Sequence, residues 1–215
     1  MNAPIAQAVN PFAGWHPIAS APEEMEAAHR ANERSLREHP YYLVRFGERG
    51  RLFGASDGGW LVSLCRAEPP FVERQVLWLG HVLASRGVPR WLLQRHLEVL
   101  HDELARTLPA GRYAALLGAA EMLRTLQQQH LPEADARALA EAFDAAADSA
   151  WVARLPGMGR ILAAAVADEA AGIARAVVSV EEWATDDRLF PERWVRAVGR
   201  TLASARETVR IRRLR

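Results

Sequence analysis

Residues 47–59 read GERGRLFGASDGG and hold five of the chain's 14 glycines, with Arg49 and Arg51 between them. Glycine at this density has two common uses. It lets the backbone approach an anion such as a phosphate, or it turns the chain and lets neighbouring elements pack closely. Which use applies decides whether this part of the chain is a nucleotide-binding loop or belongs to a helical fold.

The stretch does not match a nucleotide-binding loop. Neither G-x-G-x-x-G nor G-x-x-x-x-G-K-[ST] occurs in it, and no strand–helix–strand pattern surrounds it. All 27 basic residues are arginine, so the P-loop lysine and Schiff-base lysine chemistry are both excluded. We therefore expect these glycines to serve turns and packing. Contact of Arg49 and Arg51 with a carboxylate, a phosphate or a partner remains the alternative.

Helical signals dominate the rest of the chain. Ser20 and Glu23 form a capping box around Pro22, and His39-Pro40 ends that helix. Gly87 ends a helix over 70–86, and the chain then enters another helix that runs to about 107. So short a connection predicts an antiparallel helical hairpin. Further helices are expected over 111–129, 133–151 and 157–178, in a short piece after Ser179, and from Pro191 almost to the C-terminus.

Residues 41–65 allow two interpretations. The pieces YYLVRF, RLF and WLVSLC are short, rich in aromatic or β-branched residues and separated by glycine, which suits a small β-meander. The same residues also suit a glycine-bent helix followed by a helix that Ser56-Asp57 would cap. We favour the helical interpretation.

The predicted fold is all-α, a multi-helix bundle of about eight to nine helices, with a short β-meander at 41–65 as the alternative. We expect an irregular N-terminal arm at 1–19 and one helical domain over 20–215, with 108–111 as the place for any subdivision. The alanine and glycine content of 111–177 predicts tightly packed helices rather than a roomy pocket.

Composition excludes several classes of protein. A formal charge of +1 argues against a generally basic nucleic-acid binder. The one cysteine, Cys65, rules out an intrachain disulfide and any multi-cysteine metal site. No apolar run approaches the roughly 20 residues of a membrane span, and the first residues do not resemble a signal peptide. We expect a cytoplasmic protein without a membrane partner.

Two E-x-x-H spacings raise the question of a metal site. They are Glu26/His29 and Glu98/His101, and on a helix each pair lies on one face. This spacing resembles the motif of ferritin-like di-iron proteins, which implies iron or manganese as the metal. The predicted hairpin puts Glu73 at the level of His101. Against a site there, the helical wheel places Glu98 on the solvent-exposed flank.

Glu169 is a further candidate ligand. The residues Leu162, Val166, Glu169, Ile173 and Val177 follow helical spacing, which predicts a core position for Glu169. A buried carboxylate must be paired, protonated or bound to a metal. An arginine partner from another helix is one explanation, and a ligand role is the other. The candidate metal ligands are therefore Glu73, Glu98, His101 and Glu169.

The C-terminal helix combines an apolar stripe with many arginines. From 191 to 215 there are eight arginines and two glutamates, a local charge of +6 (8 − 2). The stripe, which should dock the helix, consists of Trp194, Val198, Leu202, Ala205 and Val209. The last residues either fray or meet an acidic surface of this protein or of a partner. Candidate binding residues are therefore Arg210, Arg212 and Arg213.

Three functions remain open from the sequence. We favour a helical module without catalytic activity that binds a protein partner or a small ligand through the arginines of 45–51 and 206–215. The alternative is a metal-dependent enzyme built on a helical bundle, of the non-haem di-iron type. A third hypothesis is a regulator that contacts nucleic acid through the C-terminal helix, which lacks interleaved aromatic residues.

Overall fold

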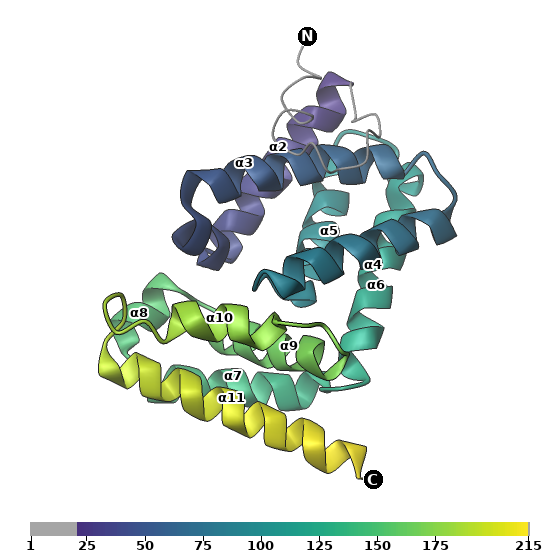
Figure 1. Cartoon of the computed structure of the whole chain (residues 1–215). Coiled ribbons are helices and arrows are strands. Elements are labelled where there is room, and N and C mark those ends of the chain that lie inside the picture. The colour runs from purple at the N-terminus through teal and green to yellow at the C-terminus, as the bar shows by residue number, and fades with distance from the viewer. Residues whose placement is uncertain (1–20, 215) are drawn as a thin grey trace. The chain divides into compact units, whose positions relative to one another are not determined.

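The fold is all-α. The structure is a computed structural model that describes residues 21–214. The expected arm at 1–19 and the capping residue Ser20 lie outside the described residues. Within 21–214 no strand is formed, and residues 41–64 are helical rather than a β-meander (Figure 1). The α-helices are α2 (Pro22–Glu38), α3 (Tyr41–Leu64), α4 (Pro69–Ser85), α5 (Arg90–Ala105), α6 (Ala114–Gln128), α7 (Glu133–Ala146), α8 (Ser149–Arg154), α9 (Met158–Ala170), α10 (Ala176–Ala184) and α11 (Glu192–Arg213), and η1 (Ala110–Tyr113) is a 3₁₀-helix.

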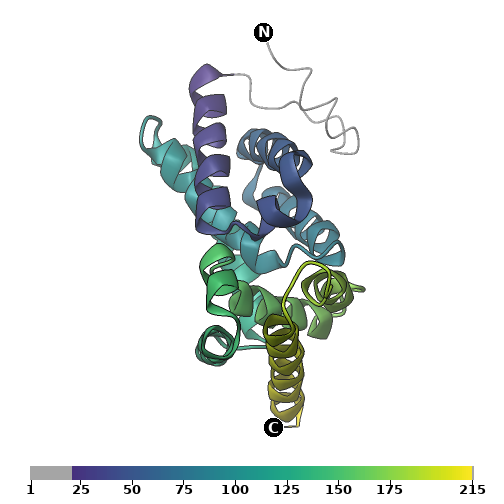
Figure 2. The same cartoon turned by 90° about the vertical axis from the view of Figure 1, so that its left-hand side faces the viewer.

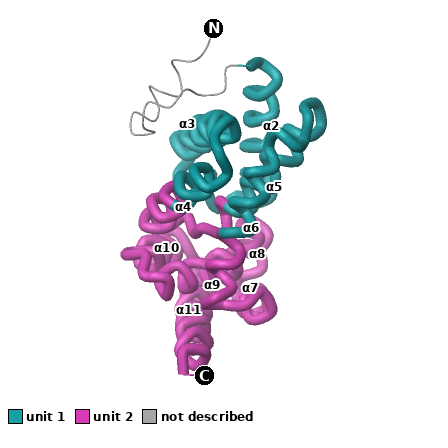
Figure 3. Tube along the Cα trace, turned by 90° about the vertical axis from the view of Figure 1, so that its right-hand side faces the viewer, with its two compact units in different colours: residues 1–77, 94–122 teal, residues 78–93, 123–215 magenta. Residues whose placement is uncertain are grey.

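The chain forms two compact units (Figure 3). Unit 1 comprises the chain up to Leu77 together with 94–122, and unit 2 comprises 78–93 together with the chain from Leu123 onward. The boundaries fall inside α4, α5 and α6 rather than in loops. Sequence reasoning places linkers in loops rich in turn residues, so it gives no signal for a division of this kind.

Gly47 breaks α3 into two parts. Its backbone has φ 60° and ψ −152°, which glycine adopts far more readily than any residue with a side chain. The helical path resumes at once, so α3 continues to Leu64 and the expectation of a glycine-bent helix is confirmed. Ser56 and Asp57 lie inside this helix. The expectation that they cap a new helix is wrong, because no helix begins there.

Gly54 lies where α3 approaches α2 closely in unit 1 (Figure 2). A Cβ atom at Gly54 would lie less than 3.0 Å from Oδ1 of Asn32, and one at Gly58 would lie 3.7 Å from Cβ of Ala28. Ala27 and Ala28 of α2 are fully buried. Nδ2 of Asn32 donates to the carbonyl oxygen of Arg51 at 3.2 Å, which ties the two helices together. Gly54 therefore serves close helix packing, whereas Gly58 has room for a Cβ atom.

The end of α4 has the geometry expected for Gly87. Gly87 has φ 83°. Its N–H donates to the carbonyl oxygen of Ala84 at 2.9 Å, and the N–H of Val88 donates to the carbonyl oxygen of Leu83 at 2.9 Å. These are the two hydrogen bonds of a Schellman motif, which satisfies carbonyl groups at the helix end. The predicted helix stop is therefore confirmed.

Two helices expected as single pieces are each divided. The segment over 133–151 forms α7 and α8, because Asp148 starts a new helix by accepting the backbone N–H groups of Ala150 and Trp151. The segment over 157–178 forms α9 and the first residues of α10, because Gly172 adopts φ 86° after Ala170. The expected helix start at Ser179 is wrong, because Ser179 lies inside α10, which begins at Ala176. The N–H of the residue after Gly172 donates back to the carbonyl oxygen of Asp168 at 3.0 Å, as in a second Schellman motif.

Unit 2 is a tight helical core, as its alanine content predicts. Residues 161–167 of α9 are all buried, and a Cβ atom at Gly159 would lie 2.8 Å from Cα of Ala140 in α7. The predicted apolar stripe of α11 is also buried. Among residues 21–214, no helix combines the length and hydropathy that crossing a bilayer requires. Beside this core lies an aromatic cluster of Phe143, Trp151, Trp183, Phe190 and Trp194.

The crossing of α7 and α9 is testable at Gly159. In Gly159→Ala the new methyl group would meet the backbone of Ala140, so we expect the free energy of unfolding to fall by about 2–3 kcal/mol. In the control Gly199→Ala a Cβ atom meets nothing within 4 Å, and we expect no loss or a gain of up to about 1 kcal/mol. Urea denaturation followed by circular dichroism measures both. Equal effects of the two changes would contradict the close crossing.

Candidate functional site

The first half of α3 carries large apolar side chains that the fold does not bury. Helical spacings of three and four residues bring three of its side chains together before Gly47 and three more after it. Leu52 is 48% exposed, Arg49 is exposed, and the other four are half-buried. We call this set the aromatic–arginine face; it consists of Tyr42, Arg45, Phe46, Arg49, Leu52 and Phe53.

Arginines of this face lie over its aromatic rings. The guanidinium carbon of Arg45 is 4.9 Å from the ring centroid of Phe46, and that of Arg49 is 5.4 Å from the ring centroid of Phe53. The rings of Tyr42 and Phe46 are 5.1 Å apart. Cation–π contact of this kind limits the orientations of a guanidinium group. Arg45 also donates a hydrogen bond to the hydroxyl group of Tyr41.

The two arginines that the sequence singles out here have different surroundings. Arg49 is exposed and stacked on Phe53. Arg51 is held inside unit 1 by ion pairs with Glu33 at 3.2 Å and with Glu48 at 3.5 Å. Of the pair, Arg49 is therefore the better candidate for contact with another molecule.

The C-terminal arginines largely contact unit 2 itself. Arg210 forms a two-pronged ion pair with Glu207 at 2.7 Å, on the same helix. Arg212 is 3.4 Å from Asp135 of α7, and Arg213 donates to the carbonyl oxygen of Ala170 at 2.5 Å. The helix extends to Arg213. Of these three arginines, Arg212 meets a carboxylate outside its own helix, which is the expected contact with an acidic surface of this protein.

The four predicted metal ligands do not form a metal site with one another in the described structure. Glu98 is paired with Arg95 of its own helix and accepts from Gln94 at 3.0 Å. Glu73 and His101 are half-buried residues of unit 1, whereas Glu169 belongs to unit 2. Within 21–214 no group of three or more His, Cys, Asp or Glu side chains is arranged to hold a metal ion.

The expectation that Glu169 occupies a core position is wrong. Its side chain is partly exposed and forms a two-pronged ion pair with Arg206 of α11, at 2.9 and 3.0 Å. The stripe that predicted its burial ran from 162 to 177, across the helix break at Gly172. Because α9 is buried on every side up to its last turn, the stripe could not distinguish Glu169 from its neighbour Asp168.

Asp168 is the buried carboxylate of unit 2. Its side chain is 0% exposed and accepts two hydrogen bonds from Arg90, one from Nε at 2.6 Å and one from the backbone N–H at 2.9 Å. Burial raises the pKa of Asp168, and the charge and hydrogen bonds of Arg90 oppose that rise. Arg90 is the first residue of α5, and the N–H groups at the start of a helix have no partner within it. Asp168, which is far from Arg90 in sequence, therefore also caps α5 by accepting this N–H group. Its role is therefore structural.

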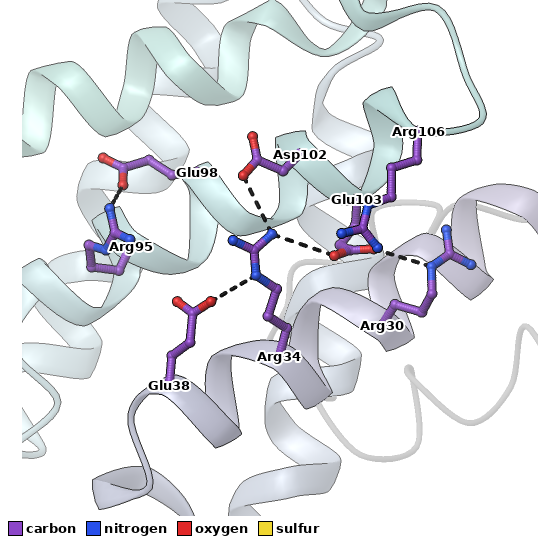
Figure 4. Close-up of polar contacts among 8 residues, drawn as sticks. All are labelled: Arg30, Arg34, Glu38, Arg95, Glu98, Asp102, Glu103 and Arg106. Atoms are coloured by element: carbon purple, nitrogen blue, oxygen red, sulfur yellow. Dashed lines mark hydrogen bonds and ion pairs between the residues drawn. The ribbon is translucent and has the colours of Figure 1, made fainter. Parts of the chain in front are cut away.

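Unit 1 contains a network of arginines and carboxylates between α2 and α5 (Figure 4). At its centre Glu103 is buried and meets Arg30 at 3.3 Å, Arg34 at 3.5 Å and Arg106 at 2.9 Å. Arg34 also reaches Glu38 at 2.8 Å. The eight residues drawn comprise four arginines and four carboxylates, so their charges cancel (4 − 4 = 0). We interpret the network as one that holds α2 against α5, and not as a ligand site.

A second buried carboxylate of unit 1 is Glu24. It accepts from Tyr113 Oη at 2.8 Å and from Arg66 at 2.8 Å, and it lies 3.3 Å from Arg112. Nearby, burial raises the pKa of the Cys65 thiol to about 12, and the charge of Glu24 adds to this effect. A reactive cysteine needs a lowered pKa, so the raised pKa of Cys65 favours a packing role.

His96 of α5 is a half-buried histidine of unit 1. Its Nδ1 is 2.9 Å from Oγ of Ser35, while Nε2 is buried without a hydrogen-bond partner among the described residues. Burial lowers the pKa of His96 to about 4, so the ring is neutral at pH 7. No sequence motif distinguishes this histidine from the other six.

Comparison of the chain with protein-family models, with curated proteins and with solved structures found no match.

His96 should make stability depend on pH. The unfolded chain binds a proton at the ordinary pKa of 6.5, whereas the folded protein binds it only near pH 4. The free energy of unfolding should therefore fall as the pH is lowered from 6.5 to 4, by about 3 kcal/mol from this residue. Urea denaturation at several pH values, compared between the wild type and His96→Gln, isolates the contribution. The same pH dependence in both proteins would rule it out.

Proposed function

We propose that this chain is a helical module without catalytic activity that binds a protein partner, and that the aromatic–arginine face of α3 is the contact surface. The observation that carries the proposal is the exposure of Leu52 beside the exposed Arg49, which is stacked on Phe53, in the part of α3 that follows Gly47. Aromatic residues and arginine are enriched among the residues that dominate the free energy of protein–protein association. The cytoplasmic location expected from the sequence is part of the same proposal.

The rest of the polar surface supports this assignment by contrast. The network around Glu103 has no net charge, and Glu24 and Asp168 are buried with arginine partners. The C-terminal arginines, which were the second candidate surface, contact unit 2 itself. The aromatic–arginine face combines the exposed Leu52 with an exposed arginine that lies over an aromatic ring. At the end of α11, Ile211 and Leu214 are also exposed, but the arginines beside them contact unit 2.

The metal-dependent enzyme ranks second among the proposals. Two of its four predicted ligands, Glu98 and Glu169, each form an ion pair with an arginine that would have to be displaced. A contact with nucleic acid through α11 ranks third, because Arg210, Arg212 and Arg213 each have a partner within unit 2.

Peptide selection tests the proposal and does not require the natural partner to be identified. The full chain is used to select binders from a random phage-displayed peptide library, and their dissociation constants are measured by fluorescence anisotropy. We expect Leu52→Ser to raise the dissociation constants of the selected peptides by about tenfold, which is the effect of losing one contributing interface residue.

A matched control is available in unit 2. Leu189 is 50% exposed, close to the 48% of Leu52, so Leu189→Ser removes a similar apolar surface from a different place. We expect it to leave binding unchanged, and both variants to keep the melting temperature of the wild type. The proposal fails if no peptide is enriched, or if the two leucine variants weaken binding equally.

A further inference from the structure

The positive charge of the aromatic–arginine face indicates which chemical class of protein segment it binds. Resting on the proposed function above, we infer that this face binds an acidic amphipathic segment of another protein, with Arg49 receiving a carboxylate of that segment. The partner's apolar side chains would lie against Leu52 and Phe53. Both Arg49 and Leu52 are exposed, so their side chains are accessible for recognition.

The charge balance of the segment is positive. Residues 41–53 contain three arginines and one glutamate, a net charge of +2 (3 − 1). Of the three arginines, Arg51 is already neutralised within the unit by Glu33 at 3.2 Å. Arg45, Arg49 and Glu48 then leave a net charge of +1 (2 − 1), and Arg49 is the exposed arginine of the three residues. A surface of this sign attracts carboxylates and repels basic segments.

Arg49 is positioned for a specific contact rather than a diffuse one. Its guanidinium group lies over the ring of Phe53, with the guanidinium carbon 5.4 Å from the ring centroid, and this limits the orientations that the side chain can adopt. A planar guanidinium group can bind a carboxylate through two parallel hydrogen bonds. Because the exposed Leu52 lies next to the same ring in sequence, an apolar side chain and a carboxylate of one partner segment can be bound together.

The surroundings favour a protein partner over single-stranded nucleic acid. Bases stack on free aromatic faces. In this surface Phe46 and Phe53 each have one ring face covered by an arginine, Arg45 and Arg49 respectively.

The experiment uses the peptides selected by the full chain. We expect them to be rich in Asp and Glu beside aromatic or aliphatic residues. Replacing their carboxylates by amides should weaken binding at least tenfold in 50 mM salt, with a smaller loss in 500 mM salt. Arg49→Glu should abolish binding of the acidic peptides and restore binding of peptides whose carboxylates are replaced by arginine. The matched control Arg137→Glu changes an exposed arginine of α7 and should have no effect.

The possible results separate this inference from the proposed function. Peptides that depend on Leu52 but bind equally well after Arg49→Glu would overturn the acidic partner and leave the proposed function standing. Absence of any peptide that depends on Leu52 would overturn both. Binding of a labelled 20-nucleotide oligo(dT) that is lost in Arg49→Gln would replace the protein partner by nucleic acid.

Discussion

The close approach of α3 to α2 is the constraint on which the presentation of the candidate surface depends. At Gly54 the two helices are so close that a single methyl group would collide with the side chain of Asn32. Glycine inside a helix costs about 0.5–1 kcal/mol relative to alanine, so these positions must be offset by packing. Burial of the alanines of α2 and the hydrogen bond from Asn32 to the carbonyl of Arg51 supply that offset. With one side of α3 fixed in this way, Arg49, Leu52 and Phe53 remain accessible on the helix.

In both units, the buried carboxylates have arginine partners. Glu24, Glu103 and Asp168 are each nearly inaccessible to solvent, and each is met by at least one arginine. Removing a carboxylate from water is costly, and only good geometry with hydrogen bonds to its oxygens compensates for that cost. Arginine, the only basic residue of this chain apart from histidine, provides several N–H groups in a fixed plane for this purpose. Many of the arginines are therefore structural, and their number alone does not indicate a binding protein.

Features that are determined by a few neighbouring residues could be predicted from the sequence, whereas contacts between residues far apart in the sequence could not. Helix periodicity, the stop at Gly87 and the bend in the glycine-rich stretch are encoded within a few residues, and all three were predictable. The position of Glu169 was not, because its stripe spans the break at Gly172 and the neighbouring helices bury Asp168 instead. The pairings of Glu103 and of the C-terminal arginines join residues far apart in sequence, so composition showed only that such charges existed. Arg49 was predicted as a binding residue, whereas its stacking on Phe53 emerges only once α3 is known to be a helix. Its binding role stays a prediction.

The most direct test of this account is a double-mutant cycle between Gly54 and Asn32, measured as free energies of unfolding. If the helices meet as described, Gly54→Ala should cost about 1–3 kcal/mol in the wild type, because the new methyl group displaces the Asn32 side chain. In the Asn32→Ala background the obstacle is gone, and the same change should be neutral or stabilise by up to about 1 kcal/mol. Gly118→Ala, where a Cβ atom meets nothing within 4 Å, should behave alike in both backgrounds. A cost of Gly54→Ala that does not depend on Asn32 would contradict the close α2–α3 contact and the presentation of the surface derived from it.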